Sequence, residues 1–302
     1  MSTEIIDLSR IPPPDIVENI DPEKILQDWI AALVQKDGAY DALLESDPAY
    51  IQGEALSVRE SLLRQRVNEA IRAVLLASSQ GDDLDQLGGN FDVQRLITVP
   101  AQPDAIPPVD ATYESDEAFR ERIQLSWSRL STAGAWNAYK YFASGADGDV
   151  LDVEAYGPET HNMPGQVLIY VLSRTGNGSA SEALVAAVHS AVNAKDVRPI
   201  TDYVTTASAI IAPYRVVADV YIPYGLDADV VMDTARKSLD AYTQSVHRVG
   251  GVVARSGIDG SLHQPGVVRV TLTEPPGDVL SRMGEAPWCS EIVLNKVLFN
   301  GD

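Results

Sequence analysis

The sequence predicts an α+β protein, in which an N-terminal helical region is followed by mixed-sheet, sandwich-like α/β modules. Two observations predict this fold class. Apolar residues recur at helical spacing through most of the first 148 residues. From Asp149 onward, short apolar runs bounded by turn residues alternate with helical segments, a pattern that favours sheets with helices on one face.

The chain is predicted to begin with an extended lead, residues 1–20, because three consecutive prolines at 12–14 cannot lie inside a helix. A helical region, residues 21–97, follows. Asp21 and Pro22 have the order of an N-cap and a first helical turn. The apolar face of this first helix is expected to consist of Ile25, Leu26, Trp29, Ile30 and Leu33.

A long amphipathic helix is predicted at residues 56–79, after a break at 48–53. Its opposite face is rich in arginine and glutamate, with a favourable i,i+4 pair between Glu60 and Arg64. We interpret it as a bundle helix whose apolar stripe contacts other subunits, with packing inside its own domain as the alternative. The candidate subunit-interface residues are Leu63, Val67, Ala70, Ile71 and Val74.

Residues 98–115 are predicted to be a Pro-rich linker and a domain boundary, because four prolines fall within nine residues there. Such a segment is also a candidate hinge. Residues 116–148 are predicted to form a helical hairpin. Its expected buried faces are Phe119, Ile123, Trp127 and Leu130 on the first helix, and Trp136, Tyr139 and Phe142 on the second.

The α+β sheet region, residues 149–302, contains six predicted strands and two predicted helices. The first helix is expected to open at a capping box, Ser179 to Glu182. The second is expected at 228–246. The strands are expected at 150–155, 166–172, 207–211, 214–222, 267–273 and 291–299. The resulting order suggests two β-β-α units as a hypothesis.

Charge and composition exclude several classes of protein. The formal net charge is −20, with 43 acidic and 23 basic residues, so binding to nucleic acid or to an anionic membrane surface is not expected. No apolar run is long enough for a membrane span. The single cysteine, Cys289, cannot form an internal disulfide, which is typical of proteins made in cytoplasm.

No motif indicates an enzyme, a cofactor or a metal site. The four histidines lack metal-ligand spacing, and the carboxylates at 82–85 lack the calcium-loop pattern. Gly176-Asn177-Gly178 lies between a predicted strand and a predicted helix, yet it is not a phosphate-binding loop motif. The alternative to a structural protein is therefore a soluble enzyme or ligand-binding α+β module with a site near Gly176–Gly178 and His161.

Six segments in order resemble the baseplate J family, the wedge proteins of contractile-tailed phages, R-type pyocins and related injection systems. Two lie in the helical region, ESLLRQRVNEAIRAVLLASSQGDDLDQLGGNFDVQRL at 60–96 and YESDEAFRERIQLSWSRLSTAGAWNAYKYFA at 113–143. The others are VLDVEAYGP at 150–158, GQVLIYVLSRTGNGSAS at 165–181, VRPITDYVTTASA at 197–209 and PGVVRVTLTEPPGDV at 265–279.

This resemblance implies a structural role in a phage tail baseplate or a tail-like particle assembled in the bacterial host cytoplasm. It implies pairing with a second copy of the chain, and binding to a smaller wedge protein near the sheath and tube and to a wedge protein that links to the tail fibre. Six such wedges are expected to close a ring around the hub and to transmit the conformational change that triggers sheath contraction. The family supplies no catalytic residues.

Overall fold

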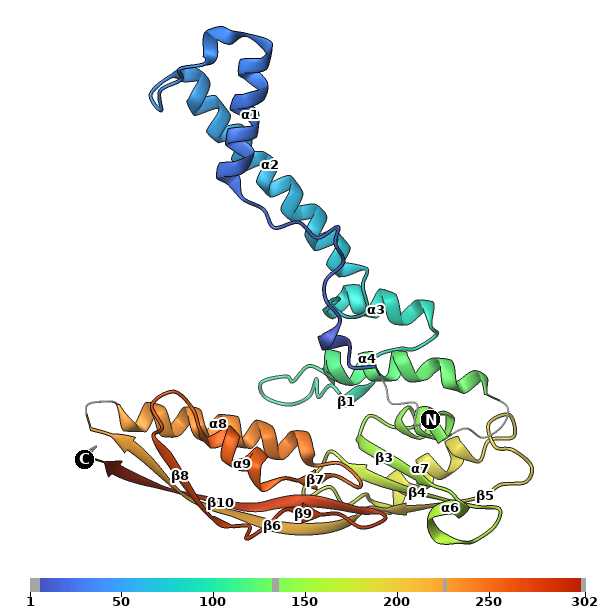
Figure 1. Cartoon of the computed structure of the whole chain (residues 1–302). Coiled ribbons are helices and arrows are strands. Elements are labelled where there is room, and N and C mark those ends of the chain that lie inside the picture. Colours follow the sequence, from blue (N-terminus) through green and yellow to red (C-terminus); the bar gives the residue numbers. More distant parts are fainter. Residues whose placement is uncertain (1–5, 132–135, 225–226, 300–302) are drawn as a thin grey trace. The chain divides into compact units, whose positions relative to one another are not determined.

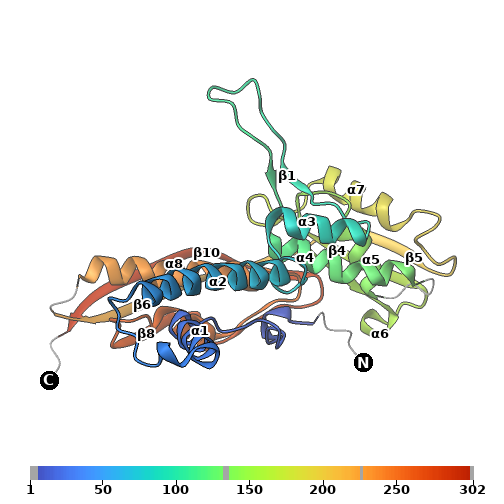
Figure 2. The same cartoon turned by 90° about the horizontal axis from the view of Figure 1, so that it is seen from above.

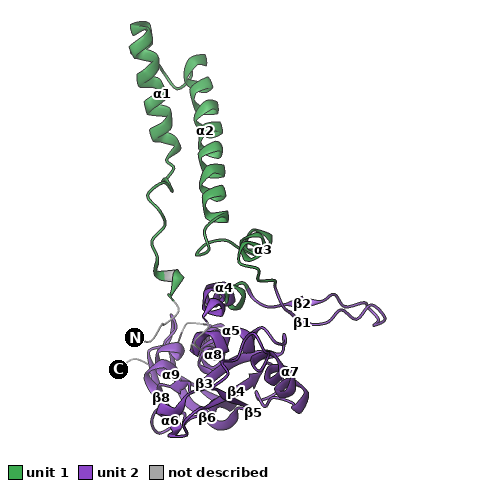
Figure 3. Ribbon diagram, turned by 90° about the vertical axis from the view of Figure 1, so that its right-hand side faces the viewer, with its two compact units in different colours: residues 1–94, 116–120 green, residues 95–115, 121–302 purple. Residues whose placement is uncertain are grey.

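The structure is a computed structural model that describes residues 6–131, 136–224 and 227–299. The chain divides into two compact units (Figure 3). Unit 1 comprises Met1–Gln94 and Asp116–Arg120, and unit 2 comprises Arg95–Ser115 and Glu121–Asp302. Helices dominate the first unit and mixed sheets with helices the second, so the predicted α+β class is confirmed.

Unit 1 is built on two long helices, α1 (Pro22–Lys36) and α2 (Pro48–Ala73), which pack against each other (Figures 1 and 3). Asp21 caps α1 as expected, because its side chain accepts hydrogen bonds from the backbone of Glu23 and Lys24. Two short 3₁₀ helices, Leu8–Arg10 and Gly38–Tyr40, lie before and after α1.

The start of α2 corrects a prediction. Residues 48–53 were expected to be a break, yet they form the first turns of the helix. Pro48 is tolerated because the first helical position needs no N–H partner. Gly53 lies where α1 approaches most closely, since a Cβ atom there would meet the Trp29 ring at 2.6 Å. The glycine therefore permits helix packing instead of ending a helix.

The end of α2 also differs from the predicted residue 79, because the helix ends at Ala73. Arg120 donates hydrogen bonds to the carbonyls of Leu76 (2.7 Å) and Ser79 (2.8 Å), and Ser78 Oγ donates to the Arg72 carbonyl. These contacts satisfy carbonyl groups that a continuing helix would have used. Helix α3 (Gly81–Asn90) follows.

Residues 98–115 form most of a β-hairpin, and the chain passes from one compact unit to the other just before and just after this segment. Strand β1 (Ile97–Val99) pairs antiparallel with β2 (Thr112–Tyr113). The prolines lie in the connection, where a Gln102–Val109 bridge joins the two arms (Figure 2). The base is held by buried Glu114, which accepts a hydrogen bond from the Leu96 N–H and pairs with Arg122.

The predicted helical hairpin corresponds to α4 (Asp116–Leu125), a 3₁₀ helix (Ser126–Leu130) and α5 (Trp136–Ser144). Phe119, Ile123 and Tyr139 are buried as expected. Trp127 and Leu130, however, are 66% and 67% exposed, so the predicted buried face does not extend into the 3₁₀ helix.

The first sheet of unit 2 has the order β3-β4-β5, with β3 (Val150–Tyr156) antiparallel and β5 (Tyr203–Ser208) parallel to β4 (Gln166–Ser173). Helix α5 packs on β3, and helix α7 (Glu182–Val192) packs on β5. The N-cap of α7 is Ser181 and not the predicted Ser179. A single turn, α6 (Pro158–His161), connects β3 to β4. The core consists of Tyr139, Ala143, Val150, Val153, Ala155, Ile169, Val171, Leu184, Val188, Val192 and Val204.

The second sheet has the order β10-β6-β8, with β6 (Ile210–Pro223) parallel to β10 (Glu285–Phe299) and antiparallel to β8 (Arg269–Glu274). Helices α8 (Ala228–Val246) and α9 (Arg255–Leu262) cover it (Figure 1). Two short strands, β7 (Val252–Val253) and β9 (Val279–Leu280), form a separate pair. The core consists of Tyr214, Val216, Ala218, Ala235, Leu239, Val253, Ile258, Leu262 and Leu272.

Two strand predictions need correction. Pro213 was expected to separate two strands, but it lies inside β6, beside Trp288 of β10 and outside the stretch that pairs with β8. Among the described residues, no strand pairs with that side of β6 at Pro213, and such a position is where a proline is tolerated. The two suggested β-β-α units are also not equivalent, because β5 and β6 belong to different sheets.

Candidate subunit-interaction surface on helix α2

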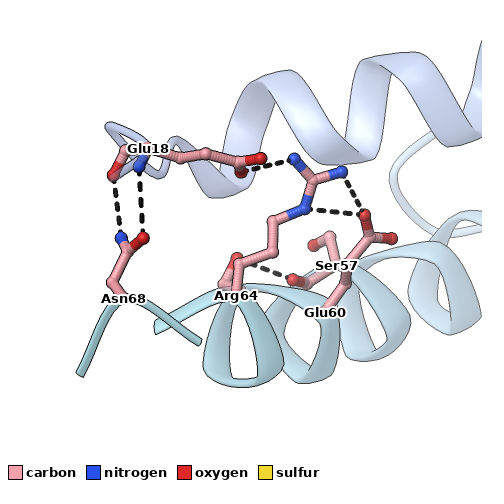
Figure 4. Close-up of polar contacts among 6 residues, drawn as sticks. Glu18, Ser57, Glu60, Arg64 and Asn68 are labelled. Carbon is pink, nitrogen blue, oxygen red and sulfur yellow. Dashed lines mark hydrogen bonds and ion pairs between the residues drawn. The ribbon is translucent and has the colours of Figure 1, made fainter. Parts of the chain in front are cut away.

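One face of α2 is held by its own chain and is polar. The buried residues of the helix are Gly53, Ser57 and Asn68. The Asn68 side chain accepts a hydrogen bond from the Glu18 N–H (3.1 Å) and donates one to the Glu18 carbonyl (2.9 Å) (Figure 4). The side chain of Asn68 thus supplies hydrogen-bond partners for the backbone N–H and carbonyl of Glu18 in the extended lead.

Arg64 completes this attachment, one turn away from Asn68. Its guanidinium contacts Glu18 at 2.9 Å and Glu60 at 2.6 Å (Figure 4). The hydrogen bonds that Arg64 donates to the carboxylates of Glu60 and then Glu18 raise the pKa of Arg64. The pairs are about half exposed, so they orient the lead more than they stabilise it. We call the contacts of Glu18 with Arg64 and Asn68 the clasp.

The stripe predicted from sequence lies outside the clasp. Within unit 1, Leu63, Val67 and Val74 are 67%, 55% and 67% exposed, and Ala70 is exposed as well. Only Ile71 is half-buried. The structure therefore does not pack the predicted stripe inside its own domain, which was the alternative to a subunit interface.

A second apolar stripe was missed by the sequence reading. Ile51, Val58 and Leu62 are 53%, 54% and 65% exposed. Their spacing of seven and four residues is helical, but Ile51 was assigned to the supposed break at 48–53, so only Val58 and Leu62 fell within the predicted helix. At 3.6 residues per turn, the clasp face, the predicted stripe and this second stripe lie roughly a third of a turn apart around the helix.

The surface has the chemistry of helix packing. Exposed Leu, Ile and Val at helical spacing on two sides of one helix favour contact with further helices, because monomeric proteins rarely expose contiguous apolar patches of this kind. Arg59 and Arg66 lie between the two stripes, and both are exposed. Neither stripe carries a nucleophile or a general base.

The residues of the alternative enzyme site do not come together. Gly178 lies against Leu172 and His247, and its N–H donates to the Thr175 carbonyl within a tight turn. His161 contacts the Tyr156 carbonyl through Nε2 and the Met163 N–H through Nδ1. Each group is used by its own loop, and they share no contact.

A pocket of about 330 Å³ in unit 2 contains neither group. Trp136, Tyr139, Tyr156, Glu159 and Asp202 are among its lining residues. The Tyr139 hydroxyl donates to Asp202 at 2.7 Å, and burial raises the pKa of that tyrosine. In the part of the chain that the structure describes, no group of three or more His, Cys, Asp or Glu side chains is placed to hold a metal.

Within the same described residues, no helix has the length and apolar character needed to cross a bilayer.

Comparison with known proteins gives one consistent result. Residues 45–102 match the baseplate J-like N-terminal domain, and residues 131–208 match the baseplate J-like central domain. Baseplate protein J of Escherichia phage P2 is 42% identical over 294 residues, covering 95% of this chain and 96% of that protein. The N-terminal match includes all of α2, and the central match covers the first sheet. The chain therefore belongs to the baseplate J family.

Proposed function

We propose that this chain is a structural component of the baseplate of a contractile phage tail or tail-like particle. It pairs as two copies in each wedge, binds the smaller sheath-proximal and the fibre-linking wedge proteins, and joins them in a ring around the hub. It is assembled in the host cytoplasm and resides in the virion baseplate. The ring transmits the conformational change that triggers sheath contraction.

The observation that carries this proposal is the arrangement of three faces on α2. One face is occupied by the chain's own lead and α1, and the other two are apolar and exposed. A helix with two open apolar stripes suits the centre of a multi-chain bundle, because each stripe covers one neighbouring helix. In the assembly, helices of other subunits would then cover the two apolar stripes of α2 and stabilise it.

The test is co-expression of the chain with the products of its neighbouring genes, followed by size-exclusion chromatography with light scattering. We expect a complex that contains two copies of this chain and at least one other protein. Leu63→Asp and Leu62→Asp each place a charge on one apolar stripe, and each should remove a different partner or copy from the complex. Ile71→Asp tests the half-buried residue beside the clasp.

Gln86→Asp is the matched control, because Gln86 is exposed on α3 and belongs to neither stripe of α2. Circular dichroism of each variant establishes that the monomer folds. Normal assembly of folded Leu63→Asp and Leu62→Asp proteins would contradict the proposed role of α2. A wild-type chain that stays monomeric with all of its neighbours would contradict the wedge function itself.

The geometry does not favour the alternative enzyme site, since Gly176–Gly178 and His161 are engaged in separate turns.

A further inference from the structure

The predicted stripe of α2 has the period of a coiled-coil seam. Six residues lie along it at alternating steps of four and three: Leu56, Glu60, Leu63, Val67, Ala70 and Val74. All six are exposed, and all but Glu60 are apolar. An apolar row with this period stays on one side of a helix and packs continuously along a neighbouring helix. We call these six residues the seam.

One flank of the seam is used by the chain itself. It consists of Ser57, Arg64 and Ile71, which directly follow alternate seam residues. Ser57 is buried and Ile71 is half-buried. Arg64 donates hydrogen bonds to the carboxylate of Glu60 at 2.6 Å and to that of Glu18 at 2.9 Å (Figure 4). The charge of Glu60, the polar member of the seam, is therefore balanced inside unit 1.

The opposite flank carries positive charge. Arg59 and Arg66 directly precede seam residues and are seven residues apart, so they occupy equivalent positions of the repeat, and both are exposed. Among the described residues, the Arg59 side chain has no hydrogen bond or ion pair, and the ion pair of Arg66 with Glu69 is long, at 3.8 Å. Leu62 and Leu63 lie between the two arginines on the helix surface and supply no counter-charge.

A second copy of α2 on the seam would not balance these arginines. In a parallel pair of helices, a residue on this flank faces the opposite flank of the partner five residues further on, so Arg59 would meet Arg64. The carboxylates beside Arg64 are already engaged by it. In an antiparallel pair, equivalent flanks face each other, and Arg59 and Arg66 would meet the same arginines of the other copy. Both directions bring like charges together at the seam.

The other helices of this chain do not supply the missing carboxylates either. Among the helices that the structure describes, only α8 carries two carboxylates seven residues apart, Asp233 and Asp240. Lys237 pairs with the first at 2.7 Å and Arg236 with the second at 3.2 Å. The apolar face of α8 is buried in the core of the second sheet. A suitable partner helix therefore belongs to a different protein.

We propose that the seam of α2 binds an acidic amphipathic helix of another baseplate protein, whose carboxylates pair with Arg59 and Arg66. The apolar seam residues supply the contact area, and the two arginines select the partner by charge. This inference rests on the proposed function for the presence of such partners, and it states the chemistry of one of them. The stripe of Ile51, Val58 and Leu62 stays available to a further helix.

The first test couples amines to carboxylates in the complex purified after co-expression with the neighbouring gene products. Arg59→Lys and Arg66→Lys keep the positive charge and introduce an amine, which a water-soluble carbodiimide joins only to a carboxylate in direct contact. Mass spectrometry should find both amines joined to aspartates or glutamates of one helix in another protein. Arg64→Lys is the reference, because it should couple to Glu60 or Glu18 of its own chain.

The second test reverses the charges. The double variant Arg59→Glu with Arg66→Glu should raise the dissociation constant for the crosslinked partner about tenfold or more, because like charges then face each other. Circular dichroism should show an unchanged fold, since both positions are exposed. Replacing the partner carboxylates found by crosslinking with lysine should restore binding. Arg282→Glu is the control for added negative charge, because Arg282 is exposed and lies in unit 2, and its effect should stay within about twofold.

Three results would overturn this assignment in a complex that still assembles. They are the absence of intermolecular crosslinks from both amines, crosslinks to α2 of a second copy, and an affinity that the folded double variant leaves unchanged. All three leave the wedge function standing, because that function is read from the composition of the complex. A wild-type chain that binds none of its neighbours would instead overturn the wedge function, and this inference with it.

Discussion

The side-chain amide of Asn68 and the backbone of Glu18 form two hydrogen bonds with each other across fifty residues of sequence. Asparagine is a poor helix former, because its side chain competes for backbone partners. In α2 the Asn68 side chain instead bonds the backbone of Glu18, which belongs to the N-terminal lead. The lead lies along the polar face of α2, and the apolar stripes stay exposed.

Replacing Asn68 tests the clasp. Asn68→Ala leaves the N–H and the carbonyl of Glu18 without these partners, and we expect a loss of about 1–3 kcal/mol in the free energy of unfolding. Hydrogen exchange at the Glu18 amide should accelerate. Gln65→Ala is the control, because it removes only an exposed side-chain bond to Glu69, worth about 0.2–0.5 kcal/mol. Unchanged exchange in Asn68→Ala would contradict the role of the clasp.

The close approach of α1 and α2 is tested at Gly53. Alanine is the better helix former, yet Gly53→Ala places a Cβ atom 2.6 Å from the Trp29 ring. We expect destabilisation of about 1–3 kcal/mol from overpacking, measured by urea unfolding. Gly89→Ala in α3 has no neighbour within 4 Å and should stabilise the protein by about 0.5–1 kcal/mol. Equal effects of the two changes would contradict this interpretation.

The hairpin found at the predicted linker depends on Glu114. Its side chain is 1% exposed, and its partner Arg122 is 10% exposed. Glu114→Ala removes the buried ion pair with Arg122 and the hydrogen bond to the Leu96 N–H, and we expect a loss of about 3–5 kcal/mol in the free energy of unfolding. Glu117→Ala, at an exposed position of α4, should cost no more than about 1 kcal/mol. Thermal melts of both variants make the comparison.

A pH dependence is expected from Glu154. Burial raises its pKa above the ordinary value of 4.5, although Lys140 lies 3.1 Å away and opposes the shift. The folded protein therefore holds this proton more tightly than the unfolded chain. Its stabilising contribution is full below pH 4.5 and is lost as the pH rises through the raised pKa.

Glu154→Gln should remove this dependence. We expect the free energy of unfolding of the wild type, relative to Glu154→Gln, to decrease from acidic to neutral pH. Urea titrations across that range measure it, with Glu159→Gln as the exposed control. A difference that stays constant or increases with pH would show that the pair with Lys140 outweighs burial.

Elements whose signals are local were predictable. The cap at Asp21 and the full extent of α8 follow from the order of polar and apolar residues alone. The stripe at Leu63, Val67 and Val74 was also identifiable from its spacing, although sequence could not decide whether the chain itself would cover it. Its role as a subunit interface stays a prediction.

Elements whose signals come from distant residues were misread. Gly53 and the prolines of 98–115 look like breaks when only neighbours in sequence are considered. In the structure, the glycine is required by Trp29, and the prolines lie between strands whose base is held by Glu114. The stripe at Ile51, Val58 and Leu62 was lost for the same reason.

The sequence by itself determined the fold class, the family and most helix and strand positions, because periodicity, capping and family motifs are carried by residues close together in the chain. The tertiary structure decided which face of α2 is covered and where α2 ends. Those outcomes depend on Glu18 and Arg120, whose contacts lie far away in sequence. Only folding brings such groups within hydrogen-bonding distance.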